Sequence, residues 1–163
     1  MLSWTMFRKK KETTENEKIR ILFVDETNEL QSQIAEFFLK EFYGDVYEAC
    51  SAGAHFDHMD CELISSMYQI GYDIRQYRAK DFRSKQILKE YDYLVFLQQE
   101  TYDRIKDIAP YTCKKVMGKD FGTRKDLKAT DDKELFEAYK QLVAQVGEWV
   151  KETFRDPSAL EGM

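Results

Sequence analysis

The sequence is poor in the two residues that most often break regular structure, with 7 glycines and 2 prolines among 163 residues. This scarcity excludes a loop-rich or disordered chain, and an apolar fraction of 43% is typical of a soluble globular protein. The length predicts one domain with its own hydrophobic core and is too short for two. No apolar run reaches the roughly 20 residues of a membrane-spanning helix, so no transmembrane segment is expected.

The chain also has few cysteines and no net positive charge. The three cysteines, Cys50, Cys61 and Cys113, are odd in number and widely spaced. Together with the lack of an apolar secretory segment at the start, they indicate reduced thiols and a cytoplasmic protein. The formal net charge of -5 argues against a nucleic-acid partner.

The two ends of the chain are predicted to lie outside the domain, which we expect to span residues 19–154. Residues 1–18 combine an apolar start with a basic run at 8–11, and we interpret them as a charged, flexible N-terminal tail. The alternative is a weak contact of residues 2–11 with a membrane surface, through Trp4 and Phe7. Residues 155–163 are expected to form a C-terminal tail.

Strand-like and helix-like patterns alternate from Ile19 onward. Short apolar runs rich in β-formers predict strands, and apolar residues at helical spacing predict the helices between them. The expected strands are 19–24, 46–50, 93–97 and 115–117, and the expected helices are 32–42, 60–70, 84–90, 99–108 and one that starts near Asp131 and runs through Val150. This alternation predicts an α/β domain with a parallel sheet, helices on both faces and a ligand site at the carboxyl ends of the strands.

The loop after the first strand has the backbone form of an anion-binding site, but its side chains carry negative charge. Residues 25–31 join a buried strand to a helix start, where unpaired N–H groups and the helix dipole favour a negative ligand. Asp25, Glu26 and Glu29 place three carboxylates in this loop, which holds no Lys or Arg. A phosphate would be repelled, because two unit charges about 4 Å apart interact by about 4 kcal/mol at an effective dielectric near 20.

The order of motifs along the chain resembles that of the low-molecular-weight protein-tyrosine phosphatases and their relatives, the thioredoxin-coupled arsenate reductases. The signature of that family is an apolar strand followed by Cys, five residues, Arg and Ser, with Asn inside the loop, and residues 23–36 lie over it without a gap. Further segments follow in the family's order: Ser51-Ala52-Gly53, Gly71-Tyr72-Asp73-Ile74, Tyr77-Arg78-Ala79-Lys80 and the strand in 91–97. The resemblance implies a three-layer α/β/α fold with a four-stranded parallel sheet.

The resemblance also implies which site residues are kept and which are replaced. Asp25 stands where the family has its nucleophilic Cys, and Gln31 where it has the Arg that binds phosphate. Asn28 and Ser32, which in the family shape the loop and hydrogen-bond the thiolate, are retained. The other loop positions that would line the binding site are Glu26, Thr27, Glu29 and Leu30.

The family's general acid is an Asp followed by Pro in the loop ahead of the last helix. Asp126 is the nearest match, and Asp120 is the second candidate. Neither is followed by Pro in this chain. The expected position of the general acid is therefore Asp126.

These replacements predict a pseudophosphatase, a family member without catalysis that acts as a binding or regulatory module. Loss of an arginine of this kind lowers phosphoryl-transfer rates by a factor on the order of 10³ or more. We expect the Asp25 carboxylate to fill the cradle and accept the loop N–H groups. The alternatives are an acidic pocket that binds a cation or a basic group of another protein, and residual or metal-assisted phosphate-ester hydrolysis that uses Asp25 as nucleophile.

Both histidines lie in a second cluster, His55-x-x-His58-x-x-Cys61, near Cys50. His and Cys are zinc ligands, which makes His55, His58 and Cys61 the candidate metal ligands, but their spacing matches no common zinc motif. We interpret Cys50 and Cys61 as core thiols instead. No metal and no other cofactor is therefore expected.

Overall fold

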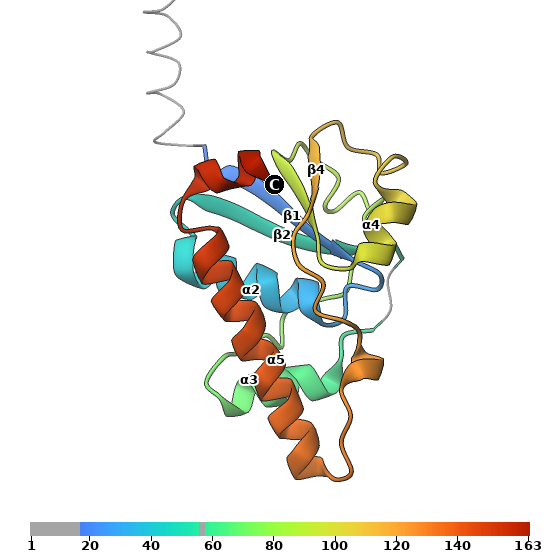
Figure 1. Cartoon of the computed structure of the whole chain (residues 1–163), viewed down its shortest axis with the longest axis vertical. Coiled ribbons are helices and arrows are strands. Elements are labelled where there is room, and N and C mark those ends of the chain that lie inside the picture. Colours follow the sequence, from blue (N-terminus) through green and yellow to red (C-terminus); the bar gives the residue numbers. More distant parts are fainter. Residues whose placement is uncertain (1–16, 56–57) are drawn as a thin grey trace, which may run out of the picture.

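A four-stranded parallel sheet forms the centre of the computed structural model, which describes residues 17–55 and 58–163 (Figure 1). The strand order is β2-β1-β3-β4, with β1 at Ile19–Asp25, β2 at Tyr47–Gly53, β3 at Tyr93–Phe96 and β4 at Lys114–Met117. β1 is buried from Ile21 to Asp25, as its unbroken apolar run predicts for a strand covered on both faces. The predicted flexibility and membrane contact of the N-terminal tail concern residues outside the described part of the chain, except Glu17 and Lys18.

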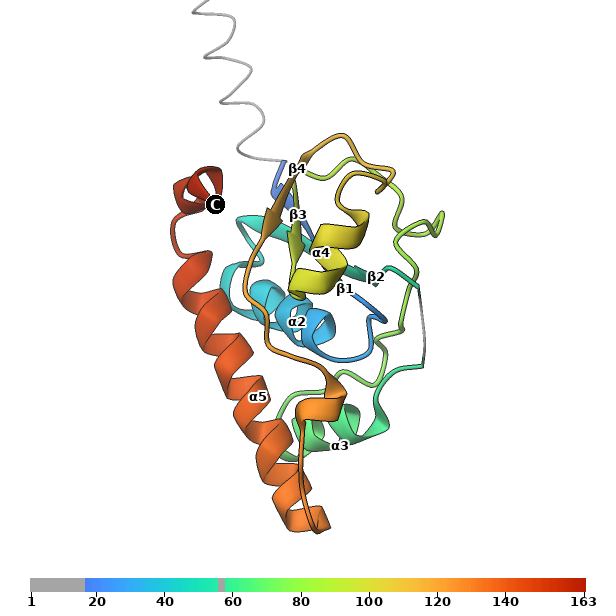
Figure 2. The same cartoon turned by 45° about the vertical axis from the view of Figure 1, so that its right-hand side comes forward.

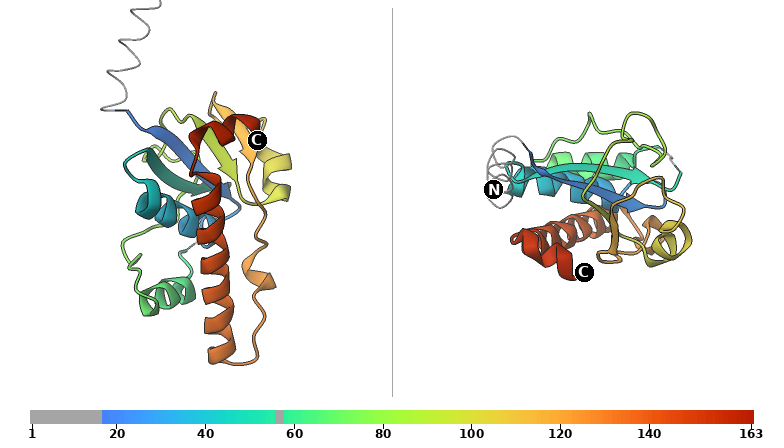
Figure 3. Two further views of the ribbon diagram at one scale, coloured as in Figure 1. Left: turned by 60° about the vertical axis from the view of Figure 1, so that its left-hand side comes forward. Right: turned by 90° about the horizontal axis from the view of Figure 1, so that it is seen from above.

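Helices cover both faces of the sheet, which confirms the predicted three-layer α/β architecture. The helices are α2 at Gln31–Tyr43, α3 at Cys61–Gln69, α4 at Gln99–Ile105 and α5 at Asp132–Thr153. Figures 2 and 3 show α5 running alongside α2 and reaching α3. Alternate residues of β1 enter two cores: Ile21 and Phe23 pack with α2, α3 and α5, while Leu22 packs on the other face with Ile105 of α4.

One predicted helix is absent, and the C-terminal tail has structure of its own. Residues 84–90 form turns rather than a helix. Ile87 of this segment is buried against the sheet, while Leu88 is exposed. After α5, Pro157–Gly162 forms a 3-10 helix, and Leu160 is fully buried in the core.

The segment between β4 and α5 contains a short 3-10 helix, η1, at Arg124–Asp126. Within the described residues, no helix is both long enough and apolar enough to cross a membrane. The predicted order of strands and helices is otherwise confirmed, with α4 ending at Ile105 instead of 108.

The strand order places one position at the centre of the carboxyl edge. β1 leads into α2 on one face of the sheet, and its neighbour β3 leads into α4 on the opposite face. Connections that leave two adjacent parallel strands toward opposite faces open a crevice between them, where α/β proteins bind ligands. Asp25 ends β1 at this crevice, and Gln98 follows β3 there.

Candidate functional site

The Asp25 side chain lies inside the loop that follows β1. Its Oδ1 accepts a hydrogen bond from the Asn28 N–H at 2.7 Å, and its Oδ2 accepts one from the Ser32 N–H at 3.0 Å. The residue is only 2% exposed. Burial raises the pKa of Asp25, and the hydrogen bonds from Ser32 and Asn28 oppose that rise. The expectation that this carboxylate accepts the loop N–H groups is confirmed.

Asn28 gives the loop its shape. It has a φ of 57°, in the left-handed region that asparagine tolerates better than most residues. Its Nδ2 donates to Ser32 Oγ at 2.8 Å, and its Oδ1 accepts from the Lys80 backbone N–H at 2.8 Å. A Cβ on Gly53, at the end of β2, would lie 2.8 Å from the Asn28 nitrogen, so glycine is needed where β2 meets the loop.

Gln31, at the position where the resemblance puts a phosphate-binding Arg, contacts the segment after β4. Its Nε2 donates to the Gly122 carbonyl oxygen, and the residue is 3% exposed. Gln98 reaches the same carbonyl oxygen at 3.4 Å with its Nε2, while its Oε1 accepts the Glu26 N–H at 2.6 Å. The sequence gives no signal for Gln98, because a neutral amide after a strand has no distinctive pattern.

Glu26 is not a free carboxylate. Its Oε2 accepts hydrogen bonds from Arg104 and, at 2.7 Å, from Thr101 Oγ1, and its Oε1 lies 3.2 Å from His55 Nε2. Partial burial raises the pKa of Glu26, but the Arg104 and Thr101 contacts outweigh it, so the pKa lies below its ordinary value. Arg104 on α4 therefore neutralises one of the three acidic residues of the loop. The sequence predicts three carboxylates with no cation in the loop, and the structure adds this cation from a distant helix.

The remaining loop residues differ in burial. Leu30 is 1% exposed and packs in the core, so its side chain does not line an open binding surface. Thr27 and Glu29 are half-buried. The Glu29 carbonyl oxygen accepts the Asp60 N–H at 3.4 Å, which joins the loop to the start of α3.

Both candidates for the general acid already accept hydrogen bonds from backbone N–H groups. Asp126 Oδ2 accepts the Thr123 N–H at 2.7 Å and caps η1. Asp120 accepts the Gly122 N–H at 2.8 Å and the Gln99 N–H, at the start of α4, at 2.9 Å. Both carboxylates hold the backbone of the segment that contacts Gln31.

The described residues do not bring His55, His58 and Cys61 together into one group of potential metal ligands. Among the described residues, which omit 56 and 57, no group of three or more His, Cys, Asp or Glu side chains is arranged to hold a metal ion. His55 instead pairs with Glu26. Cys61 is exposed at the first residue of α3, so its assignment as a core thiol is wrong, whereas Cys50 is partly buried against the second core.

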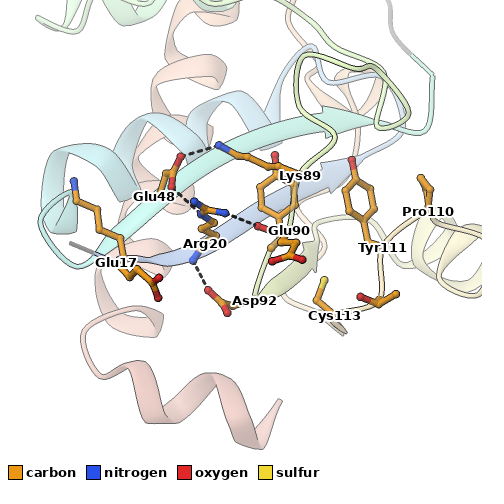
Figure 4. Close-up of a pocket in the computed structure, with 12 residues that line it drawn as sticks. Glu17, Arg20, Glu48, Lys89, Glu90, Asp92, Pro110, Tyr111 and Cys113 are labelled. Carbon is orange, nitrogen blue, oxygen red and sulfur yellow. Dashed lines mark hydrogen bonds and ion pairs between the residues drawn. The ribbon is translucent and has the colours of Figure 1, made fainter. Parts of the chain in front are cut away.

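Two of the cavities lie at opposite ends of the central strands. The smaller, of ≈ 380 Å³, is beside the loop and is lined by Glu26, Gln98, Glu100, Thr101, Arg104, Asp120 and Thr123. The larger, of ≈ 790 Å³, lies at the amino ends of β1 and β3 and contains none of the predicted site residues (Figure 4). Charged side chains in its wall pair with one another, with Glu48 accepting from Arg20 at 3.1 Å and from Lys89 at 2.7 Å.

Comparison with known proteins finds the same fold. A family model described as "Low molecular weight phosphotyrosine protein phosphatase" matches residues 20–156. A low molecular weight protein tyrosine phosphatase from T. tengcongensis is 24% identical, with a TM-score of 0.62, over 82% of this chain and 96% of that one. The tyrosine phosphatase Wzb from Escherichia coli K30, solved in complex with sulphate, is 22% identical, with a TM-score of 0.61, over the same shares of 82% and 96%.

An arsenate reductase in the phosphate binding state is also similar, at 19% identity and a TM-score of 0.54, over 82% of this chain and 95% of that one. No curated protein matches the chain. At these identities, the likeness to solved structures shows the fold.

Proposed function

The chain belongs to the low molecular weight phosphotyrosine protein phosphatase family, and from this premise we propose that it is a catalytically inactive member that acts as a binding or regulatory module. One observation carries the proposal: the loop N–H groups of Asn28 and Ser32 are already bonded to the Asp25 carboxylate. The family reaction needs a thiolate at this position, which such N–H donors stabilise, and here the same donors hold a carboxylate in place of that nucleophile.

Charge at the centre of the loop supports the same proposal. Asp25 is buried, so its negative charge is poorly screened and would repel an incoming phosphate. Gln31 brings no compensating positive charge and no bidentate fork, and its amide donates to Gly122. The nearby cation, Arg104, is bonded to Glu26.

We propose that the binding partner carries a basic group, such as a Lys or Arg side chain of another protein. The cavity beside the loop has three carboxylates in its lining, from Glu26, Glu100 and Asp120, against the single guanidinium of Arg104. Complementary charge would favour encounter with a basic protein surface.

The first test measures hydrolysis of an aryl phosphate by the full chain, with and without Mg²⁺ or Zn²⁺. We expect no turnover above background. Metal-dependent turnover that disappears in Asp25→Ala would overturn the proposal in favour of a hydrolase that uses Asp25.

The second test restores both lost groups in the double variant D25C/Q31R. If the inherited framework of Asn28 and Ser32 is intact, this variant should bind inorganic phosphate, as measured by calorimetry, while the wild type does not. The single variant D25C is the matched control, because it restores the Cys of the family signature without adding the guanidinium. Phosphate binding by the wild type at the same concentration would contradict the proposal.

A further inference from the structure

Residues 119–123, between β4 and η1, are attached to the rest of the protein mainly through side chains. They have no regular secondary structure. The Gly118 N–H donates to the Phe96 carbonyl oxygen at 2.8 Å, and in the described part of the chain the next backbone–backbone hydrogen bond after it joins Asp126 to Thr123. In Figure 2 this segment passes beside the start of α2 on its way to η1.

Two glutamine amides meet at one carbonyl group of this segment. Gln31 begins α2 and Gln98 follows β3, and the Nε2 of each donates to the Gly122 carbonyl oxygen. Gly122 has a φ of 81°, and a Cβ there would lie 2.6 Å from Asp126 Oδ2. Only glycine therefore allows the chain to turn at this point and present its carbonyl group to both amides.

We propose that residues 119–123 form a lid that Gln31 and Gln98 hold closed at the crevice between β1 and β3. The lid goes beyond the function proposed above, because it controls access to loop 25–31 whether that loop binds or reacts. Asp120 and Thr123 also line the ≈ 380 Å³ cavity beside Glu26, so opening of the lid changes the wall of that cavity. Binding of a ligand in this cavity should therefore affect the hydrogen bonds from Gln31 and Gln98 to the Gly122 carbonyl oxygen.

Trp149 on α5 is a natural reporter for the lid. Phe121 packs against its ring at a centroid distance of 5.7 Å, and a Cβ on Gly118 would lie 2.9 Å from Trp149 Cζ2. The chain has 2 tryptophans, Trp4 and Trp149. In a Trp4→Phe background, quenching of the remaining fluorescence by acrylamide therefore reports on the contact between α5 and the lid.

The experiment compares three variants with the same substitution, Gln31→Met, Gln98→Met and, as matched control, Gln99→Met. Methionine keeps the side-chain length and removes the amide donor, and at Gln98 it also removes the acceptor of the Glu26 N–H. Gln99 is adjacent to Gln98. Its side-chain amide donates to Asp103 within α4, and its backbone N–H, which the substitution keeps, donates to Asp120 of the lid. Hydrogen exchange of the full chain is followed by mass spectrometry in peptides that cover 119–123, with peptides from β1 and α5 as the measure of the intact fold.

We expect exchange in 119–123 to rise about 3- to 10-fold in Gln31→Met and in Gln98→Met, since each variant loses one hydrogen bond to the lid. The double variant should show a larger rise and stronger acrylamide quenching of Trp149, with β1 and α5 unchanged. Gln99→Met should behave as wild type. If the double variant folds poorly, exchange in the Gln98→Met single variant decides.

The lid proposal is overturned if hydrogen exchange in 119–123 equals that of the wild type in both single variants. It is also overturned if Gln99→Met shows an equal rise. Catalysis is not the readout, so this outcome leaves the proposal of an inactive phosphatase standing. Conversely, turnover of an aryl phosphate would overturn that proposal and leave the lid intact.

Discussion

Two buried aspartates at helix starts, Asp25 and Asp60, show how the same side chain is used in two ways. Each is 2% exposed, and each accepts two backbone N–H groups at the beginning of a helix: Asp25 before α2, and Asp60 as the N-cap of α3. Asp60 has additional partners. Its Oδ2 accepts the Tyr139 hydroxyl at 2.6 Å and lies 3.6 Å from Arg124 Nε.

The difference between the two aspartates lies in what surrounds the charge. Asp60 joins α3, η1 and α5 through Arg124 and Tyr139, which makes it a structural cap. Asp25 has backbone donors and, among the described residues, an electrostatic interaction with Lys80 rather than an ion pair, at the crevice where α/β folds place their ligands. Asp25 therefore has the environment of a bound anion rather than of a cap.

The largest effect expected from this comparison is that of Asp60→Ala. It removes the cap of α3 and leaves the Tyr139 hydroxyl without its acceptor, and we expect a loss of roughly 2–4 kcal/mol in the free energy of unfolding. Urea unfolding followed by circular dichroism measures it. Asp131→Ala, which removes the exposed N-cap bond of α5 to Glu134, is the control and should cost about 1 kcal/mol. Equal losses in the two variants would contradict the structural role of Asp60.

A smaller effect is expected for Asp25→Ala. The variant leaves the Asn28 and Ser32 N–H groups without their acceptor, but it also removes a buried charge. We expect a net loss of about 1–2 kcal/mol, because the two changes oppose each other. Added sodium formate, whose carboxylate can occupy the vacated cradle, should raise the melting temperature of this variant and not that of the wild type. A loss as large as that of Asp60→Ala would make Asp25 a structural cap of the same kind.

The order of strands and helices was predictable from sequence because it follows from local apolar spacing. The same holds for the loop framework, since Asn28 and Ser32 keep their places relative to β1 and α2. The helix expected at 84–90 failed because burial of Ile87 against the sheet, a contact distant in sequence, decides the conformation of that segment.

The partners of the loop were not predictable for a related reason. Gln31 contacts Gly122 at a separation of 91 residues, and Arg104 contacts Glu26 at a separation of 78. Neither pair leaves a periodic or charge pattern in the sequence. Replacement of Cys and Arg by Asp25 and Gln31 indicated what the loop had lost, while the new contacts of Gln31 and Gln98 required the structure.

The smallest and most specific effect concerns pH, because neighbouring Asp25 and Glu26 should contribute to stability with opposite signs. The pKa of Asp25 is raised by burial, so the folded protein binds its proton more tightly than the unfolded chain. Its contribution is fully present below the ordinary pKa of about 3.9 and is lost as pH rises through the folded value. The pKa of Glu26 is lowered, so its contribution is present above about 4.3 and is lost as pH falls through the folded value.

Urea unfolding of the wild type, Asp25→Asn and Glu26→Gln between pH 3 and pH 7 separates the two signs. The stability of the wild type relative to Asp25→Asn should fall as pH rises, whereas its stability relative to Glu26→Gln should rise. The two slopes differ because the Arg104 and Thr101 contacts outweigh burial at Glu26, whereas burial outweighs the hydrogen bonds at Asp25. Slopes of the same sign would mean that hydrogen bonds or cations outweigh burial at Asp25 as they do at Glu26.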